Sequence, residues 1–175
     1  MERKRFFTFL LVSAGVIGFD RLSKWIIKTT MELGETLDVI GNLLKISYIL
    51  NSGIAFGLLD RNISPAKRPL LIIISFIALG IILYIFFSLP KKTRLSGVSM
   101  GLIFGGAIGN IIDRIARGEV IDFIDVDFPN ISIPALGVQM SRFATFNLAD
   151  SSVLVGIIML LVIIIIKGGK AEGFD

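Results

Sequence analysis

The chain has 175 residues, of which 54% are apolar and only 18% are charged, and its formal net charge is +4. Because the apolar residues gather in long runs, this composition is typical of an integral membrane protein and excludes an ordinary soluble domain. The chain has no cysteine and no histidine, which excludes disulfides, thiolate nucleophiles, Ser-His-Asp triads and the His-Glu-x-x-His zinc motif.

Four segments are apolar enough to cross a bilayer, and together they predict an all-α polytopic membrane protein. A helix needs about 20 apolar residues to span the hydrocarbon core. No linker-like or low-complexity stretch divides the chain, so we expect a single membrane domain over residues 1–175. In chain order, the expected spans are residues 6–27, 70–89, 95–112 and 148–166.

The first span follows the basic sequence "MERKR" and resembles a secretory signal peptide. However, no small-x-small cleavage site precedes Asp20, and the apolar character resumes at Trp25. We therefore expect an uncleaved span that carries Asp20, Arg21 and Lys24 in its outer third.

Lysine and arginine set the expected orientation, because cytoplasmic loops of membrane proteins are enriched in these residues. Short basic clusters precede the first span, separate the second from the third, and follow the fourth. In a four-span chain all three clusters fall on one side, so both termini are expected in the cytoplasm. Basic clusters beside apolar runs indicate topology, which makes nucleic-acid binding the weaker interpretation.

The third span carries a regular series of glycines, spaced four residues apart. This spacing predicts one bare stripe along a helix, where a neighbouring helix can approach closely. We expect the stripe to serve packing within one molecule rather than a special dimer face. The series is Gly97, Gly101, Gly105 and Gly109.

Carboxylate, amide and basic side chains gather at the outer ends of three spans. An ionisable group inside a membrane helix costs roughly 2.5–3.5 kcal/mol on insertion scales, so each is a functional candidate. Each also has a structural explanation, such as helix capping or an i, i+4 ion pair, but their coincidence on one side favours a shared site. The set comprises Asp20, Lys24, Asn110, Asp113, Arg114, Asp122, Asn147 and Asp150.

A hydrolase without histidine or cysteine must move protons with Asp, Glu, Lys or Tyr. Two carboxylates about 3 Å apart share one proton, so one acts as general base towards water and the other as general acid towards a carbonyl. Asp122 and Asp150 form the strongest pair, since one precedes and the other follows a single outer loop. A Ser23–Lys24 dyad is the alternative chemistry, although adjacent helical residues point about 100° apart.

Two other classes of function remain open on these residues alone. A small transporter or channel would place charges near mid-span or in broken helices, whereas the second span carries no charge. A structural membrane anchor would not need the set of Asn and Asp residues.

Five motifs resemble, in order, those of the bacterial lipoprotein signal peptidase family, also called signal peptidase II. Each motif is weak alone, but five in order are specific, and they cover most of the chain. The stretch from Asp125 to Thr145 is longer than the family pattern, and "ATFN" lacks a proline two residues before its asparagine. The motifs are "DRLSK" (20–24), "NSGIAFG" (51–57), "GNIIDR" (109–114), "GEVIDF" (118–123) and "FNLADS" (146–151).

The resemblance implies an aspartic endopeptidase that cleaves prolipoproteins on the amino side of a diacylglyceryl-modified cysteine, with no cofactor and no metal. By motif position, Asp122 and Asp150 match the catalytic pair, and Asp20 matches a structural carboxylate, to which we add Lys24 and Asp113. The residues expected to bind substrate or support the site are Asn51, Gly53, Phe56, Asn110, Arg114 and Asn147.

The resemblance also implies four transmembrane helices with a small extracytoplasmic β-cradle and a short surface helix. "LLKISYIL" at 43–50 is rich in strand-forming residues and is the expected source of cradle strands. The implied location is the bacterial cytoplasmic (inner) membrane, with the active site at the outer leaflet. The implied partners are a lipid-modified prolipoprotein, membrane lipid and the inhibitor globomycin, with no nucleic acid, and we expect a monomer.

Overall fold

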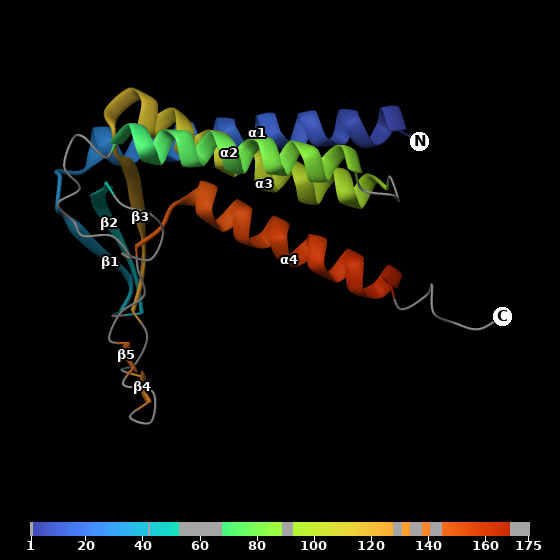
Figure 1. Cartoon of the computed structure of the whole chain (residues 1–175). Coiled ribbons are helices and arrows are strands. Elements are labelled where there is room, and N and C mark those ends of the chain that lie inside the picture. The colour runs from blue at the N-terminus through green and yellow to red at the C-terminus, as the bar shows by residue number, and fades with distance from the viewer. Residues whose placement is uncertain are drawn as a thin grey trace. The chain divides into compact units, whose positions relative to one another are not determined.

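The structure is a computed structural model, which describes residues 2–41, 43–52, 68–88, 93–127, 131–133, 138–140 and 145–168. Long helices and short strands follow one another along the chain (Figure 1). In order they are α1 (Glu2–Thr30), β1 (Thr36–Ile40), β2 (Leu44–Asn51), α2 (Arg68–Ser88), α3 (Arg94–Arg117), β3 (Val120–Val126), β4 (Ile131–Ile133), β5 (Val138–Met140) and α4 (Leu148–Gly168).

Four helices among the described residues are long and apolar enough to cross a membrane, and they match the four expected spans. The differences lie at the helix ends: α1 runs on to Thr30, and α3 runs on to Arg117. The expected spans stop at the last apolar residue. The helices continue through charged residues because a helical backbone needs no apolar side chain to form its hydrogen bonds.

Two compact units make up the chain. The helix unit comprises Met1–Asp20, Ile73–Ile112 and Leu148–Asp175, and the sheet unit comprises Arg21–Ile72 and Asp113–Asn147. The expectation of one membrane domain over residues 1–175 stays a prediction.

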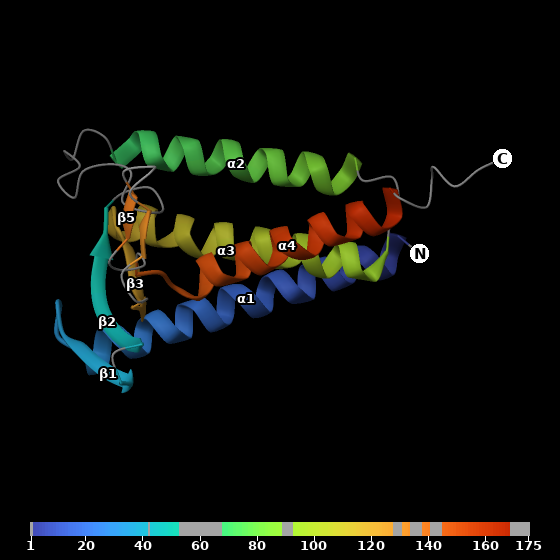
Figure 2. The ribbon, with the colours of Figure 1, turned by 90° about the horizontal axis from the view of Figure 1, so that it is seen from below.

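In the helix unit, the glycine stripe of α3 packs against α1, beside which α3 runs in Figure 2. An added Cβ at Gly97 would lie 2.6 Å from the carbonyl oxygen of Arg5, and one at Gly105 would lie 2.8 Å from Cβ of Val16. Packed Cβ atoms do not approach other atoms so closely, so larger residues would push the helices apart. The predicted role of the stripe, packing within one molecule, is therefore confirmed.

A second close contact in the helix unit joins α3 to α4. The hydroxyl of Ser99 donates a hydrogen bond to the carbonyl oxygen of Gly156 at 2.8 Å, and a Cβ at Gly156 would lie 2.8 Å from the carbonyl oxygen of Ser99. Because the residues at this contact are small, the two backbones come close enough for the hydroxyl on one helix to bond directly to a carbonyl oxygen of the other. This contact fixes the position of α4 against α3.

The sheet unit contains a three-stranded antiparallel sheet in the order β1-β2-β3 and a two-stranded hairpin, β4-β5 (Figure 1). The prediction that residues 43–50 supply a strand is confirmed by β2. Gly118 adopts a φ of +78° between α3 and β3, a left-handed conformation that glycine reaches without strain, and so turns the helix into the strand. The hairpin lies within the stretch predicted to be longer than the family pattern, and the residues described include no short surface helix.

Candidate active site

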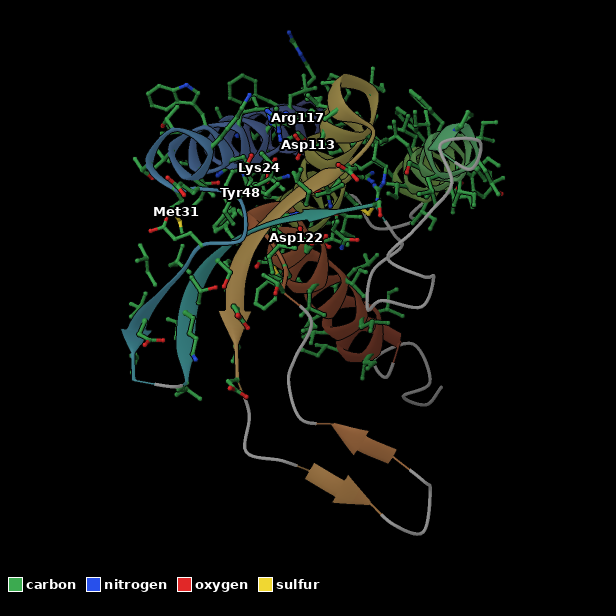
Figure 3. The ribbon with its side chains drawn as sticks, turned by 90° about the vertical axis from the view of Figure 1, so that its left-hand side faces the viewer. Lys24, Met31, Tyr48, Asp113, Arg117 and Asp122 are labelled. Atoms are coloured by element: carbon green, nitrogen blue, oxygen red, sulfur yellow. The ribbon has the colours of Figure 1, made fainter. Side chains whose placement is uncertain are left out.

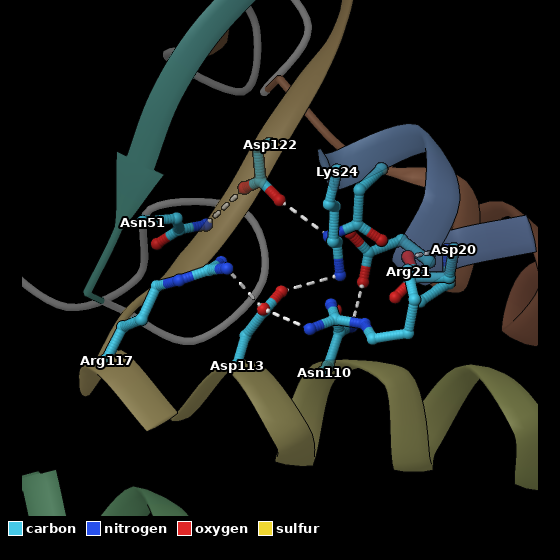
Figure 4. Close-up of polar contacts among 11 residues, drawn as sticks. Asp20, Arg21, Lys24, Asn51, Asn110, Asp113, Arg117 and Asp122 are labelled. Carbon is cyan, nitrogen blue, oxygen red and sulfur yellow. Dashed lines mark hydrogen bonds and ion pairs between the residues drawn. The ribbon is translucent and has the colours of Figure 1, made fainter. Parts of the chain in front are cut away.

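Asp122 lies on β3 and accepts hydrogen bonds from two asparagine amides. Nδ2 of Asn51 donates to Oδ2 at 2.8 Å, and Nδ2 of Asn147 donates to Oδ1 at 2.7 Å; Figure 4 shows the Asn51 contact. Asp122 is 2% exposed and Asn147 is fully buried. Because each carboxylate oxygen has its own donor, the plane and direction of the Asp122 carboxylate are fixed.

Strand pairing explains why these two asparagines reach Asp122. The β2–β3 register places Asn51 opposite Val120, two residues from Asp122 on the same face of the sheet. On the other edge of β3, Phe146 exchanges backbone hydrogen bonds with Ile124, at 2.7 and 2.9 Å. This single bridge places the next residue, Asn147, beside β3.

Asp150 belongs to the helix unit and lies in the first turn of α4. Nδ2 of Asn110, on α3, donates a hydrogen bond to Oδ1 of Asp150 at 2.8 Å. A carboxylate in the first turn also suits the positive end of the helix dipole. The helix-dipole interpretation and the site interpretation of Asp150 are therefore compatible.

Asp20 caps the start of α4. Its Oδ1 accepts a hydrogen bond from the backbone N–H of Ala149 at 3.2 Å, one of the N–H groups that lack a partner within their own helix. Gly109 leaves room for this contact, since a Cβ there would lie 2.7 Å from Oδ2 of Asp20. Asp20 thus fixes the backbone one residue before Asp150.

Asp113, in the sheet unit, is held by three cations (Figures 3 and 4). Its Oδ2 lies 2.8 Å from Nζ of Lys24, and its Oδ1 lies 2.8 Å from Arg21 and 3.0 Å from Arg117. Lys24 and Asp113 are almost completely buried. An ammonium group held in this way cannot act as a general base, which disfavours the Ser23–Lys24 dyad.

The remaining predicted site residues are placed less fully. Gly53 and Phe56 lie outside the described residues. Arg114 is half-buried on α3, and its carbonyl oxygen accepts the N–H of Gly118 at the helix end. Across the described parts of the chain, no three acidic side chains come together in a metal-binding group.

Two arginines of the Asp113 cluster were not predicted as part of the site. Arg117 stands four residues after Asp113 on the same helix, a spacing at which opposite charges meet, so its contact was readable from the sequence. Arg21 reaches Asp113 from α1, and the sequence does not give the register between two helices. Only the folded arrangement reveals that contact.

Comparison with known proteins adds a family match over residues 12–166, to a model described as "Signal peptidase (SPase) II". The "Lipoprotein signal peptidase" of Shouchella clausii (strain KSM-K16) is 36% identical over 160 residues, which cover 90% of this chain and 93% of that protein. A solved structure of a bacterial membrane enzyme is 33% identical, has a TM-score of 0.78, and matches 96% of this chain and 93% of its own. A second bacterial membrane enzyme is 35% identical with a TM-score of 0.71, over 90% and 92% of the two chains. The predicted fold class is confirmed.

Proposed function

The chain belongs to the signal peptidase II family of aspartic peptidases, and on that premise we propose that it removes signal peptides from prolipoproteins. It is a multi-pass bacterial membrane protein with lipoprotein signal peptidase activity. The proposed reaction is hydrolysis of the peptide bond on the amino side of a diacylglyceryl-modified cysteine, with Asp122 and Asp150 as the catalytic pair.

In the proposed reaction, one carboxylate takes a proton from a water molecule while the water oxygen attacks the carbonyl carbon. The other carboxyl group donates its proton to the carbonyl oxygen, which gives a neutral tetrahedral diol. The carbon–nitrogen bond then breaks as the first carboxyl group gives the nitrogen the proton that it took from water. The second carboxylate recovers a proton from the diol, and the pair returns to its starting state.

The observation that carries the proposal is that asparagine amides hold both aspartates. Asn51 and Asn147 donate to Asp122, and Asn110 donates to Asp150. An amide donor orients a carboxylate without adding a charge beside it. This suits a catalytic carboxylate, because such a group must both gain and lose a proton. The sequence also supports pairing Asp122 with Asp150, because Asn147, which donates to Asp122, stands only three residues before Asp150.

We place the site at the outer leaflet of the cytoplasmic membrane. A lipid-modified cysteine keeps its acyl chains in the bilayer, so the bond next to it stays near the membrane surface. The proposed aspartates stand near helix ends: Asp150 lies in the first turn of α4, and Asp122 follows the last residue of α3 by five residues. Globomycin is the proposed inhibitor, because it acts on the family that the motifs resemble, and the proposed working form is a monomer.

The test is cleavage of a diacylglyceryl-modified prolipoprotein by the purified protein, beside the same substrate without lipid. Asp122→Asn and Asp150→Asn are each expected to abolish cleavage, because an amide cannot accept or relay the proton. Melting temperatures should stay the same or rise slightly, since an amide at either position relieves the crowding of two carboxyl groups that must share one proton.

Asp127→Asn is the matched control. Asp127 directly follows β3, and its backbone N–H donates a hydrogen bond to the carbonyl oxygen of Leu43. Asp127→Asn therefore makes the same chemical change one residue past the strand that carries Asp122. This variant should cleave as the unaltered protein does. Substantial cleavage by either Asp122→Asn or Asp150→Asn would show that the proposed pair is wrong.

A further inference from the structure

The outer part of α1 and the end of α3 carry more positive than negative charge. Residues 20–28 and 113–119 together contain five basic and three acidic side chains. Lysine and arginine are enriched in cytoplasmic segments of membrane proteins, whereas these two segments lie on the side that we expect to face outward. The topology rule therefore does not explain the surplus of positive charge.

Two arginines share a single oxygen atom of Asp113, one on either side of the carboxylate in Figure 4. Nη1 of Arg21 lies 2.8 Å and Nη1 of Arg117 lies 3.0 Å from Oδ1, while Lys24 contacts Oδ2. The two guanidinium nitrogens are thus held within about 6 Å of each other, where like charges repel. Asp113 balances only one of these three positive charges, so a second anion beside the arginines would relieve the repulsion.

Both arginine side chains of this cluster reach the surface of the protein. The side chains of Arg21 and Arg117 are 28% and 32% exposed, whereas that of Lys24 is 1% exposed. A guanidinium group carries N–H donors along a planar fork, and the contact with one carboxylate oxygen occupies only part of that fork. An anion outside the protein can therefore meet the exposed edges without displacing Asp113.

The position of Arg21 along α1 identifies the anion as the phosphate of a membrane lipid. The apolar part of α1 begins at Phe6. At 1.5 Å per residue, Arg21 lies about 22 Å and Trp25 about 28 Å further along the helix. Because the hydrocarbon core is about 30 Å thick, Trp25 lies at its outer boundary, where aromatic side chains gather. Trp25 is 60% exposed, and the long side chain of Arg21 can extend from just inside the core to the same level.

We propose that Arg21 and Arg117 bind the phosphate group of a phospholipid in the outer leaflet. Lipid headgroups present phosphate at this depth, and arginine matches phosphate with two parallel N–H···O bonds. The bound phosphate joins α1 to the end of α3 and offsets part of the positive charge around Asp113. This lipid is distinct from the proposed substrate, because a diacylglyceryl group carries no phosphate.

The fluorescence of Trp25 provides the assay. Trp25 is the single tryptophan of the chain and stands four residues after Arg21, a spacing at which helical side chains are neighbours. The purified protein in an uncharged detergent is titrated with dioctanoyl phosphatidylglycerol. Two parallel titrations use dioctanoylglycerol, which has the same chains without phosphate, and inorganic phosphate, which has no chains. We expect a saturable change in fluorescence with the phospholipid alone.

Substitutions at the two arginines test which side chains bind the phosphate. Arg21→Gln and Arg117→Gln should each weaken phospholipid binding about tenfold, because each removes a hydrogen bond to a charged group. Arg117→Lys keeps a cation beside Asp113 and should weaken binding roughly threefold, because lysine lacks the planar fork. Lys45→Gln is the matched control, since Lys45 also pairs with a carboxylate of the sheet unit, Asp38 at 3.5 Å, and its side chain is 20% exposed. This control should bind phospholipid as the unaltered protein does.

Several results would overturn the inference. An equal fluorescence change with dioctanoylglycerol would show apolar contact alone, and saturation by inorganic phosphate at the same concentration would show a site for free phosphate. Unchanged affinity in both arginine-to-glutamine variants would show that these side chains do not bind the lipid, and an equal loss in Lys45→Gln would show general attraction between charges.

Thermal melts give a second, independent measurement. A ligand that binds only the folded protein raises its melting temperature, so the phospholipid should stabilise the unaltered protein more than Arg117→Gln. Dioctanoylglycerol should stabilise both proteins equally. Equal shifts with the phospholipid would overturn the inference, including where the variant without lipid is less stable than the unaltered protein.

Discussion

Replacing Asp113 with asparagine tests whether this carboxylate joins the outer parts of α1 and α3 in the sheet unit. The change keeps the side-chain shape and removes the charge that Lys24, Arg21 and Arg117 share. The three contacts are not equal. Lys24 is 1% exposed, whereas the side chains of Arg21 and Arg117 are 28% and 32% exposed.

The burial of each partner sets the expected magnitude. Breaking a buried ion pair by removing one charge costs about 3–5 kcal/mol, and a pair in contact with solvent contributes about 1 kcal/mol or less. An asparagine oxygen can still accept one hydrogen bond, which favours the lower end of the range. We therefore expect Asp113→Asn to lower the free energy of unfolding by about 3 kcal/mol. For a chain of this size, this corresponds to a fall of roughly 6–12 °C in melting temperature.

Thermal melts in detergent provide the assay, with two comparison variants. Arg117→Ala removes only a part-exposed contact and should cost at most about 1 kcal/mol. Lys24→Met combined with Asp113→Asn removes both buried charges and should recover part of the loss. Two results would show that the Lys24–Asp113 pair does not contribute most of the stability of this cluster. One is the same melting temperature for Asp113→Asn and Arg117→Ala. The other is a double variant that is less stable than Asp113→Asn alone.

Three further predictions concern the helix unit and the topology. Gly105→Leu should lower the melting temperature or prevent folding, because a Cβ there would lie 2.8 Å from Val16, whereas Gly80→Leu should be tolerated because no atom lies within 4 Å of its Cβ position. Asp20→Asn should cost about 0.5–2 kcal/mol through the weakened cap on α4, with activity falling as a consequence; an inactive but fully stable variant would instead assign Asp20 to the chemistry. A cysteine placed at Thr93 should resist an impermeant label applied outside intact cells, and ready labelling would invert the proposed orientation.

The helices and the glycine stripe were predictable because both are local patterns. A run of about 20 apolar residues has few alternatives to a membrane span, and a four-residue spacing of glycines lies on one side of any helix. The polar contacts between elements were not predictable in the same way. Asn147 reaches Asp122 only because Phe146 pairs with Ile124, a register that no spacing in the sequence encodes.

The basic cluster before the first span also had a contact that the sequence did not predict. Counting charges predicts which side of the membrane a segment occupies, but it does not show what each charge contacts. Arg5 is 3% exposed; it donates to the carbonyl oxygen of Phe86 and its guanidinium lies 4.0 Å from the centre of the Phe86 ring. A residue predicted as a topology signal therefore also ties the start of α1 to the end of α2.

The buried face of α1 suggests how more of the fold can be read from such a sequence. Most positions of the span are apolar, so hydrophobic periodicity does not reveal which side faces protein. Its polar residues do, because an apolar environment leaves a polar group costly unless a protein partner satisfies it. Arg5, Ser13, Asp20 and Lys24 are all buried and follow one another at intervals of eight, seven and four residues, which keeps them on one face. Several large apolar residues between them point the other way, and Phe7 and Phe19 are each 67% exposed. In a membrane helix of this kind, the rare polar residues mark the packed side, the reverse of the rule for a helix on a soluble protein.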